Sequence, residues 1–224
     1  MNAKVETKSL WNNFLTNIFM IMFLGLAITA GTAELVVAIP ILSFFYTNTF
    51  ASICLMITVL VSVFLLTSKL EKLNKFWATA SFLGYSVLNG LFLSIISAKY
   101  TSVVILPTLL STTALFVIMA FYGYFTKKDL LKYSDFFITG LIGLIVALLI
   151  NVFFQSNSVS IIISMIAIVI FSGLTAFDIQ EIREEFNSRS SDNSDELQHI
   201  AIRGALSLYL DFINMFIHLL NMRR

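Results

Sequence analysis

The chain has 224 residues, of which 58% are hydrophobic and 12% are charged, and its formal net charge is +1. Soluble domains contain about 25% charged and about 45–50% apolar residues, so this composition excludes a soluble globular domain and indicates a protein embedded in lipid. The near-neutral charge argues against a nucleic-acid partner, and the single cysteine, Cys54, excludes an internal disulfide and a cysteine-based metal cluster.

Charged residues are absent from long stretches of the sequence, and these stretches predict seven membrane-spanning helices. A helix needs about 20 residues to cross the hydrocarbon core, whereas lone strands and loops would leave backbone polar groups unsatisfied there. The uncharged stretch Phe136–Phe177 is too long for one span, and a polar turn at 155–158 divides it. The predicted helices lie at approximately 14–38, 50–68, 76–98, 102–124, 136–154, 158–178 and 199–221. We therefore predict an all-α, polytopic membrane protein with a single transmembrane domain over 1–224.

The distribution of basic residues predicts how the helices are oriented. With the N-terminus inside, every Lys and Arg except Lys99, Arg223 and Arg224 falls on the inner side, as the positive-inside rule requires. Seven crossings then place the C-terminus outside, although the two terminal arginines leave open a last helix that re-enters the membrane instead of crossing it. The first uncharged stretch is longer than the core of a signal peptide, so it is predicted to span. The segment 179–198, which is acidic and rich in Ser and Asn, is predicted to be mobile.

Three acidic residues lie within predicted helices, where a charge costs about 2.5–3.5 kcal/mol on insertion scales. They are Glu34, Asp178 and Asp211. Asp211 belongs to a polar stripe that repeats every three or four residues and comprises Gly204, Ser207, Asp211, Asn214 and His218. A carboxylate in such a stripe indicates an ion or proton site, and hydrogen bonding between helices is the alternative. For Glu34 and Asp178, which are near helix ends, the alternative is a solvated interfacial charge.

Two further polar residues within the predicted helices are candidates for an ion path. Asn89 lies midway along the third helix, where it could line a path or pack against another helix. His218 lies near the outer end of the last helix, where it could titrate at physiological pH or simply pack. The sequence contains no hydrolase triad, phosphate loop or dinucleotide fingerprint, so neither an enzyme nor a cofactor is predicted.

Three segments resemble motifs of the Bax inhibitor-1 family of membrane proteins, which is also called the transmembrane BAX inhibitor motif family. Thr175–Ile182 (TAFDIQEI) resembles its sixth-helix motif, and Ala205–Phe216 (ALSLYLDFINMF) resembles its seventh-helix motif. Gly84–Ser94 (GYSVLNGLFLS) is similar to its third helix. The order of helices and loops fits this family over nearly the whole chain. The abundance of Ile, Phe, Asn, Lys and Ser, which is typical of an AT-rich genome, and the short chain indicate a bacterial member of this family in the cytoplasmic (inner) membrane.

The resemblance implies six helices around a central last helix and a pH-sensitive calcium leak down a gradient. The family's two helical aspartates, which share a proton, correspond to Asp178 and Asp211, so these are the expected pH sensor and metal-contacting residues for Ca²⁺, the transported ion. The family also has a basic latch residue at the inner end of the second helix. Here Lys69 is the nearest candidate and Lys72 the next, and a Lys lacks the planar fork that holds a carboxylate bidentately. The candidate path-lining residues are Asn89, Ser207, Asn214, His218 and Glu34.

Two other functions are weighed against a channel. The first is a non-transporting regulator that binds other membrane proteins, such as a membrane-bound protease, through the N-terminal tail or the 179–198 segment. The second is an intramembrane aspartyl protease, which would also use two aspartates. Asp178 follows Phe177 and Asp211 follows Leu210, so the Tyr-Asp and Gly-x-Gly-Asp contexts of such proteases are missing from the sequence.

Overall fold

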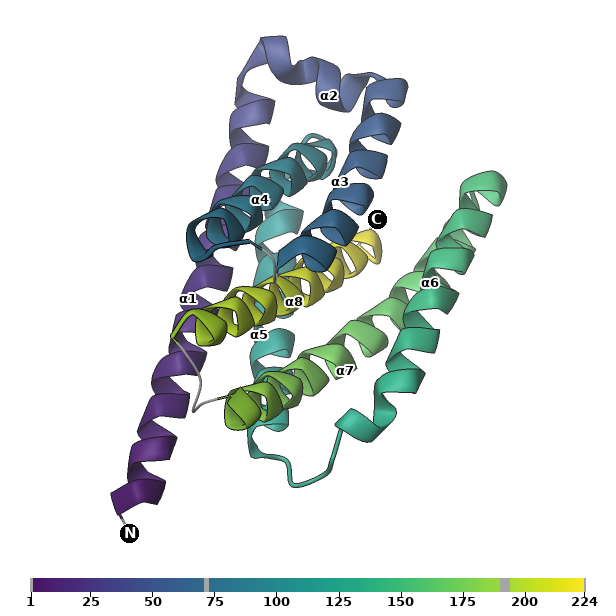
Figure 1. Cartoon of the computed structure of the whole chain (residues 1–224). Helices are drawn as coiled ribbons and strands as arrows, with labels where there is room; N and C mark the ends of the chain where they lie inside the picture. Colours follow the sequence, from purple (N-terminus) through teal and green to yellow (C-terminus); the bar gives the residue numbers. More distant parts are fainter. Residues whose placement is uncertain (1, 71–72, 190–193, 224) are drawn as a thin grey trace. The chain divides into compact units, whose positions relative to one another are not determined.

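The computed structural model describes residues 2–70, 73–189 and 194–223, and these are mostly helical (Figure 1). The α-helices are α1 (Asn2–Ala38), α2 (Phe44–Thr47), α3 (Thr49–Lys69), α4 (Lys75–Ser97), α5 (Ser102–Phe125), α6 (Ser134–Phe154), α7 (Asn157–Arg189) and α8 (Ser194–Asn221). The 3-10 turns η1 (Pro40–Ser43) and η3 (Leu131–Tyr133) lie between some of these helices. These ranges contain no β-strand, which confirms the predicted all-α class.

Within the described ranges, seven helices are long and apolar enough to cross a membrane. These candidate spans are Ser9–Ala38, Thr49–Lys69, Lys75–Ser97, Ser102–Phe125, Leu131–Asn151, Asn157–Arg189 and Glu196–Asn221. They follow the predicted helices in number and order, so the prediction of seven transmembrane helices is confirmed. The chain is a multi-pass integral membrane protein.

Polar residues and a proline set several helix boundaries. α1 ends two residues before Pro40, which has no backbone N–H to continue a helix. The side-chain oxygens of Asn48 and Asn74 each accept a hydrogen bond from the backbone N–H three residues further on, at 3.1 and 3.0 Å, and thereby cap α3 and α4. Gln155 follows the last turn of α6 with a φ of 48°, a left-handed conformation that stops the helix.

The segment 179–198 differs from its prediction. α7 continues through its first part and α8 begins within its second part, so the predicted mobile connection is wrong for these helical residues. Ile179, Ile182 and Phe186 are at most 4% exposed and recur at helical spacing, which gives this acidic stretch an apolar face to bury. The charged and Ser/Asn-rich composition masked that periodicity in the sequence. Residues 190–193 lie outside the described residues.

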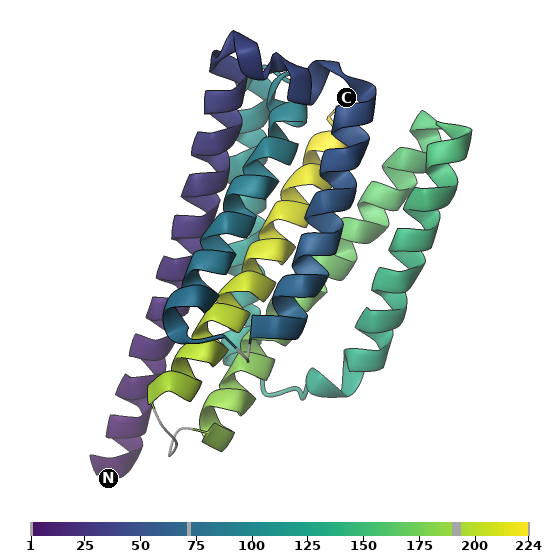
Figure 2. The same cartoon turned by 45° about the horizontal axis from the view of Figure 1, so that its top comes forward.

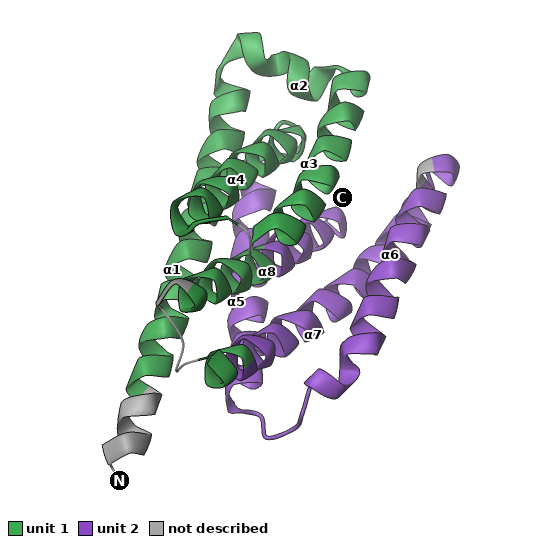
Figure 3. Cartoon of the chain, viewed as in Figure 1, with its two compact units in different colours: residues 1–101, 185–209 green, residues 102–184, 210–224 purple. Residues whose placement is uncertain are grey.

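The chain divides into two compact units (Figure 3). Unit 1 comprises 1–101 and 185–209, and it contains α1 to α4, the end of α7 and the first part of α8. Unit 2 comprises 102–184 and 210–224, and it contains α5, α6, most of α7 and the end of α8. A single domain over 1–224 and an arrangement of six helices around the last one stay predictions.

In unit 1, α1 packs along α4, and the two helices run side by side (Figure 2). Their contact includes Gly90 of α4. A Cβ atom at Gly90 would lie 2.6 Å from the Cβ atom of Thr32 and 2.7 Å from the carbonyl oxygen of Thr29. These distances are too short for non-bonded contacts, so only glycine allows the two helices to approach this closely.

Replacing Gly90 with alanine is expected to destabilise the protein by about 1–3 kcal/mol, because the added methyl group forces α1 and α4 apart. The matched control is Gly84→Ala in the same helix, where an added Cβ meets nothing within 4 Å. Thermal unfolding of both variants in detergent, followed by circular dichroism, checks this expectation. Equal unfolding midpoints for the two variants would contradict the close approach.

In unit 2, α6 and α7 form an apolar core. Its buried members are Leu144, Ile163, Ala167, Ile170 and Leu174. Partly buried apolar side chains, including two phenylalanines, pack against this cluster from the same two helices. This core holds α7 in unit 2 and thereby positions the polar residues that follow Leu174 along the helix.

Candidate ion site

Asp211 of α8 and Asp178 of α7 lie together in unit 2. Their side chains are buried, with exposed fractions of 4% and 6%. The Asp211 carboxyl group makes side-chain hydrogen bonds with Asp178 and with Thr175. Thr175 precedes Asp178 by three residues, so both side chains project from one face of α7. That face therefore presents a hydroxyl and a carboxyl group to Asp211.

A hydrogen bond between two carboxyl groups requires a proton on one of them. Two ionised carboxylates at close range in a medium of low dielectric repel one another strongly, and a proton bound by such a pair belongs to neither residue alone. The Thr175 hydroxyl group already donates to the carbonyl oxygen of Phe171 at 2.9 Å. The Thr175 side chain thus bonds both the Phe171 carbonyl group of its own helix and the Asp211 carboxyl group.

The second carboxyl oxygen of Asp211, Oδ2, is buried and has no hydrogen-bond partner within the described part of the chain. Leaving a buried acceptor unpaired costs about 1–3 kcal/mol, so this oxygen offers a position for a cation or a water molecule. The same described ranges contain no cluster of three or more His, Cys, Asp or Glu side chains that could hold a metal. A cation here would have two carboxyl groups and would complete its coordination with other oxygens, including water.

In unit 2, the other members of the polar stripe of α8, Asn214 and His218, form hydrogen bonds with groups other than Asp211. Ser207 is half-buried and belongs to unit 1. In unit 2, Asn214 donates from Nδ2 to the carbonyl oxygen of Leu210 in its own helix, at 2.8 Å. His218 is buried, and its Nδ1 lies 3.2 Å from the Ser164 hydroxyl oxygen. His218 is thus packed and hydrogen-bonded. This is the alternative that the sequence left open beside a titrating histidine.

Glu34 and Asn89, the two remaining candidates for a path, lie in unit 1. Glu34 is exposed near the end of α1, and its Oε1 accepts a hydrogen bond from the Ser97 hydroxyl group at 3.0 Å. Asn89 is 3% exposed and makes a side-chain hydrogen bond with Tyr209 of α8. Their role in lining a path stays a prediction.

Tyr209 is the centre of a buried polar cluster in unit 1. Its hydroxyl group lies 2.6 Å from the Thr29 hydroxyl oxygen, and Thr29 donates to the carbonyl oxygen of Ser86 at 2.9 Å. Thr29 uses its only hydrogen in that bond, so the Tyr209 hydroxyl donates to Thr29. Side chains from α1, α4 and α8 thus meet at one phenol. The sequence prediction missed Tyr209, because a tyrosine in an apolar helix cannot be distinguished by pattern from an aromatic residue that only packs.

The predicted latch involves residues that the structure does not bring together within one unit. Lys69 is the last residue of α3 and is exposed in unit 1, whereas Asp178 belongs to unit 2. Lys72 lies outside the described residues. A basic latch on Asp178 therefore stays a prediction.

Two residues that follow Asp178 along α7 hold the end of α5 and the connection to α6 against this helix. Arg183 donates from Nη2 to the carbonyl oxygen of Tyr124 at 3.0 Å, and its guanidinium carbon lies 4.8 Å from the centre of the Tyr124 ring. Gln180 accepts from the backbone N–H of Leu130 and donates to the carbonyl oxygen of Lys128, both at 2.9 Å. Sequence reasoning missed both, although Gln180 lies inside the TAFDIQEI segment.

The family assignment rests on a match along nearly the whole chain. Residues 11–223 match the model of the family described as inhibitor of apoptosis-promoting Bax1. The chain belongs to the Bax inhibitor-1 family. The match includes both aspartates and the segments on which the resemblance was based, so that resemblance is confirmed.

Similar proteins occur in several bacteria. An uncharacterized protein of Borreliella burgdorferi is 37% identical over 213 residues, which cover 93% of this chain and 90% of that protein. The inner membrane protein YbhL of Escherichia coli K12 is 34% identical over 220 residues, which cover 96% of this chain and 93% of YbhL. An uncharacterized protein of Deinococcus radiodurans is 36% identical over 208 residues, or 93% of this chain and 88% of that protein.

Proposed function

We propose that this Bax inhibitor-1 family member is a pH-sensitive calcium leak channel of the bacterial inner membrane, gated by Asp178 and Asp211. The observation that carries the proposal is the buried Asp211 carboxyl group, which is hydrogen-bonded to Asp178 on the preceding helix and has one oxygen free of protein partners among the described residues. The inner membrane location is supported by the seven candidate spans and by the name of the similar protein YbhL.

The two carboxyl groups can exchange a proton for a cation. With one proton, the pair forms a hydrogen bond and carries a single negative charge. When the proton leaves, the two carboxylates repel one another, and a divalent cation neutralises both. Ca²⁺ takes six to eight oxygen ligands, of which the pair supplies only some, so water and backbone carbonyl oxygens complete the shell. Such a site binds weakly, as conduction requires.

Calcium entry into liposomes tests this function. The purified wild-type protein is expected to admit Ca²⁺ to liposomes that contain a fluorescent calcium indicator, and the double variant Asp178→Asn/Asp211→Asn is expected to behave like protein-free liposomes. Asp135→Asn is the matched control, because Asp135 is an exposed carboxylate in unit 2, at the start of α6. If the double variant admits Ca²⁺ as fast as the wild type and the control, the two aspartates do not form the ion site.

A further inference from the structure

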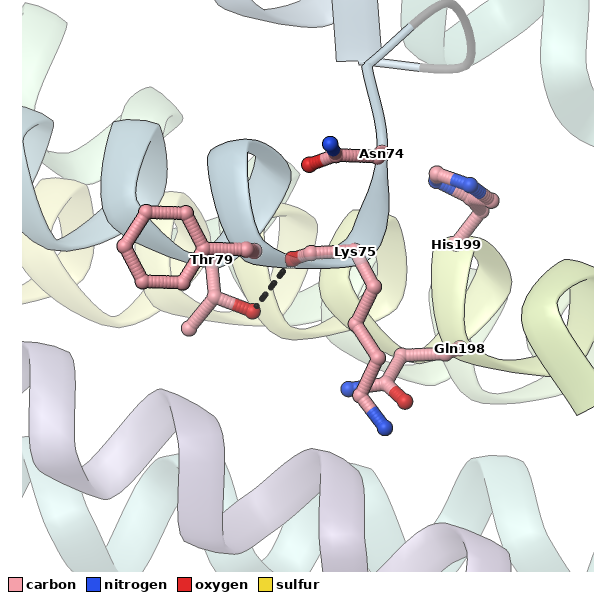
Figure 4. A pocket seen from close by; sticks show the side chains of 6 residues that line it. Asn74, Lys75, Thr79, Gln198 and His199 are labelled. Carbon is pink, nitrogen blue, oxygen red and sulfur yellow. Dashed lines mark hydrogen bonds between the residues drawn. The ribbon is translucent and has the colours of Figure 1, made fainter.

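Unit 1 contains a pocket where α4 begins and α8 has completed about one turn (Figure 4). Its volume is about 600 Å³, which is within the range of small-molecule sites. Its lining residues are Asn74, Lys75, Phe76, Thr79, Gln198 and His199. The positive-inside orientation places the start of α4 at the inner surface of the membrane. The pocket therefore lies at the level of the lipid headgroups.

The polar side of the pocket carries groups that can donate hydrogen bonds to an anion. Figure 4 shows the end of the Lys75 side chain beside the Gln198 amide, with the His199 ring on the side of Asn74. The His199 Nδ1 atom is buried and has no hydrogen-bond partner in the described part of the protein. Lysine and glutamine side chains supply hydrogen-bond donors, and the backbone N–H groups of Lys75 and Phe76 have no acceptor within the helix, whereas that of Trp77 is capped by Asn74. No carboxylate is among the described lining residues. Glu196, which is close in sequence, is exposed and lies outside the pocket.

The apolar side of the pocket continues into the part of the membrane that holds acyl chains. Phe76 and Trp77, in the first turn of α4, are 70% and 58% exposed. Aromatic side chains at this depth are typical of the membrane interface, where they contact headgroups and the upper part of the acyl chains. A soluble anion would use the basic groups and leave these rings without a partner. A phospholipid uses both surfaces.

We infer that this pocket binds the headgroup of an anionic phospholipid of the inner leaflet. The phosphate group lies against Lys75, Gln198 and His199, and the acyl chains follow the exposed rings of Phe76 and Trp77. Basic pockets between transmembrane helices on the cytoplasmic side are known to hold anionic headgroups. All of the described lining residues belong to unit 1, whereas Asp178 and Asp211 belong to unit 2.

Tryptophan fluorescence tests the site directly, because Trp77 is next to it. The chain has two tryptophans, so the variant Trp11→Phe leaves Trp77 as the only one. This variant is reconstituted in phosphatidylcholine vesicles that contain a small fraction of dibrominated phosphatidylglycerol or dibrominated phosphatidylcholine, and bromine quenches Trp77 on contact. Phosphatidylglycerol is expected to associate more tightly than phosphatidylcholine, on the order of fivefold, which corresponds to the attraction of one basic side chain at a membrane surface.

In the Trp11→Phe protein, Lys75→Gln is expected to make phosphatidylglycerol associate about as tightly as phosphatidylcholine. His199→Gln is expected to reduce the preference for phosphatidylglycerol. Lys127→Gln is the matched control, because it removes an exposed inner-side charge outside the pocket and should keep the full preference. Unchanged quenching by dibrominated phosphatidylcholine shows that each variant is correctly embedded. Equal quenching by the two lipids in the Trp11→Phe protein, or equal preferences for Lys75→Gln and Lys127→Gln, would overturn the site. Recovery of Trp77 fluorescence on addition of inorganic phosphate would show that the pocket binds a soluble anion, and it would overturn the proposal that a lipid binds there.

Discussion

Each single substitution, Asp178→Asn or Asp211→Asn, is expected to remove the pH response of calcium flux. An asparagine has nearly the shape of a protonated aspartate, and its amide donates a hydrogen bond at every pH. Either variant therefore keeps the contact between α7 and α8 in the form that the wild type adopts only when the pair holds its proton. The flux of both variants should equal, at every pH, the flux of the wild type at acid pH.

The measurement is calcium entry into liposomes over a range of pH, with equal pH on both sides of the membrane. Asp135→Asn should show the wild-type pH profile, because its exposed carboxylate is outside the pair. A single variant that retained the wild-type profile would show that pH acts through another group. His218 would then be the group to test, because it is the other titratable side chain that α8 places in unit 2 and it contacts α7 through Ser164.

The membrane-spanning helices could be predicted from the sequence because their physical requirement is simple. A span needs about 20 residues with few charges, and the positions of the acidic and basic residues mark where such a stretch must end. The same reasoning failed beyond Asp178, where α7 continues through Glu184 and Glu185. There the helix is stabilised by a short face of buried apolar residues at helical spacing. Glu185 also forms an ion pair with Arg203. A partner that is distant in sequence cannot be read from composition.

The polar candidates show a similar limit. Helical periodicity places Asp211 on one face of α8, but it does not say which helix that face meets. The contact of Asp211 with Asp178 was expected from the family resemblance alone. Asn89 lies about midway along α4, and its partner is the phenol of Tyr209. The pocket at Lys75 and His199 was not predicted at all, because its residues come from two helices that are far apart in the sequence.

A glycine in α5 determines how closely that helix approaches α7 beside the aspartate pair. A Cβ atom at Gly123 would lie 2.8 Å from the Cα atom of Ala176 and 2.9 Å from its carbonyl carbon. These are backbone atoms, so they cannot rotate away as a side chain could, and the two helices would have to separate. Ala176 lies between Thr175 and Asp178, the two residues that contact Asp211. Any displacement of α7 at Ala176 therefore moves both of them.

Gly123→Ala is accordingly expected to lower the free energy of unfolding by about 1–3 kcal/mol and to weaken calcium flux and its pH response together. Gly143→Ala is the matched control in unit 2, because a Cβ atom at Gly143 meets nothing within 4 Å. Thermal unfolding in detergent and calcium entry into liposomes measure the two effects separately. A Gly123→Ala protein that is destabilised yet keeps the wild-type pH profile would show that the aspartate pair tolerates displacement of α7. A protein with the stability of Gly143→Ala would show that the helices already have room for the methyl group.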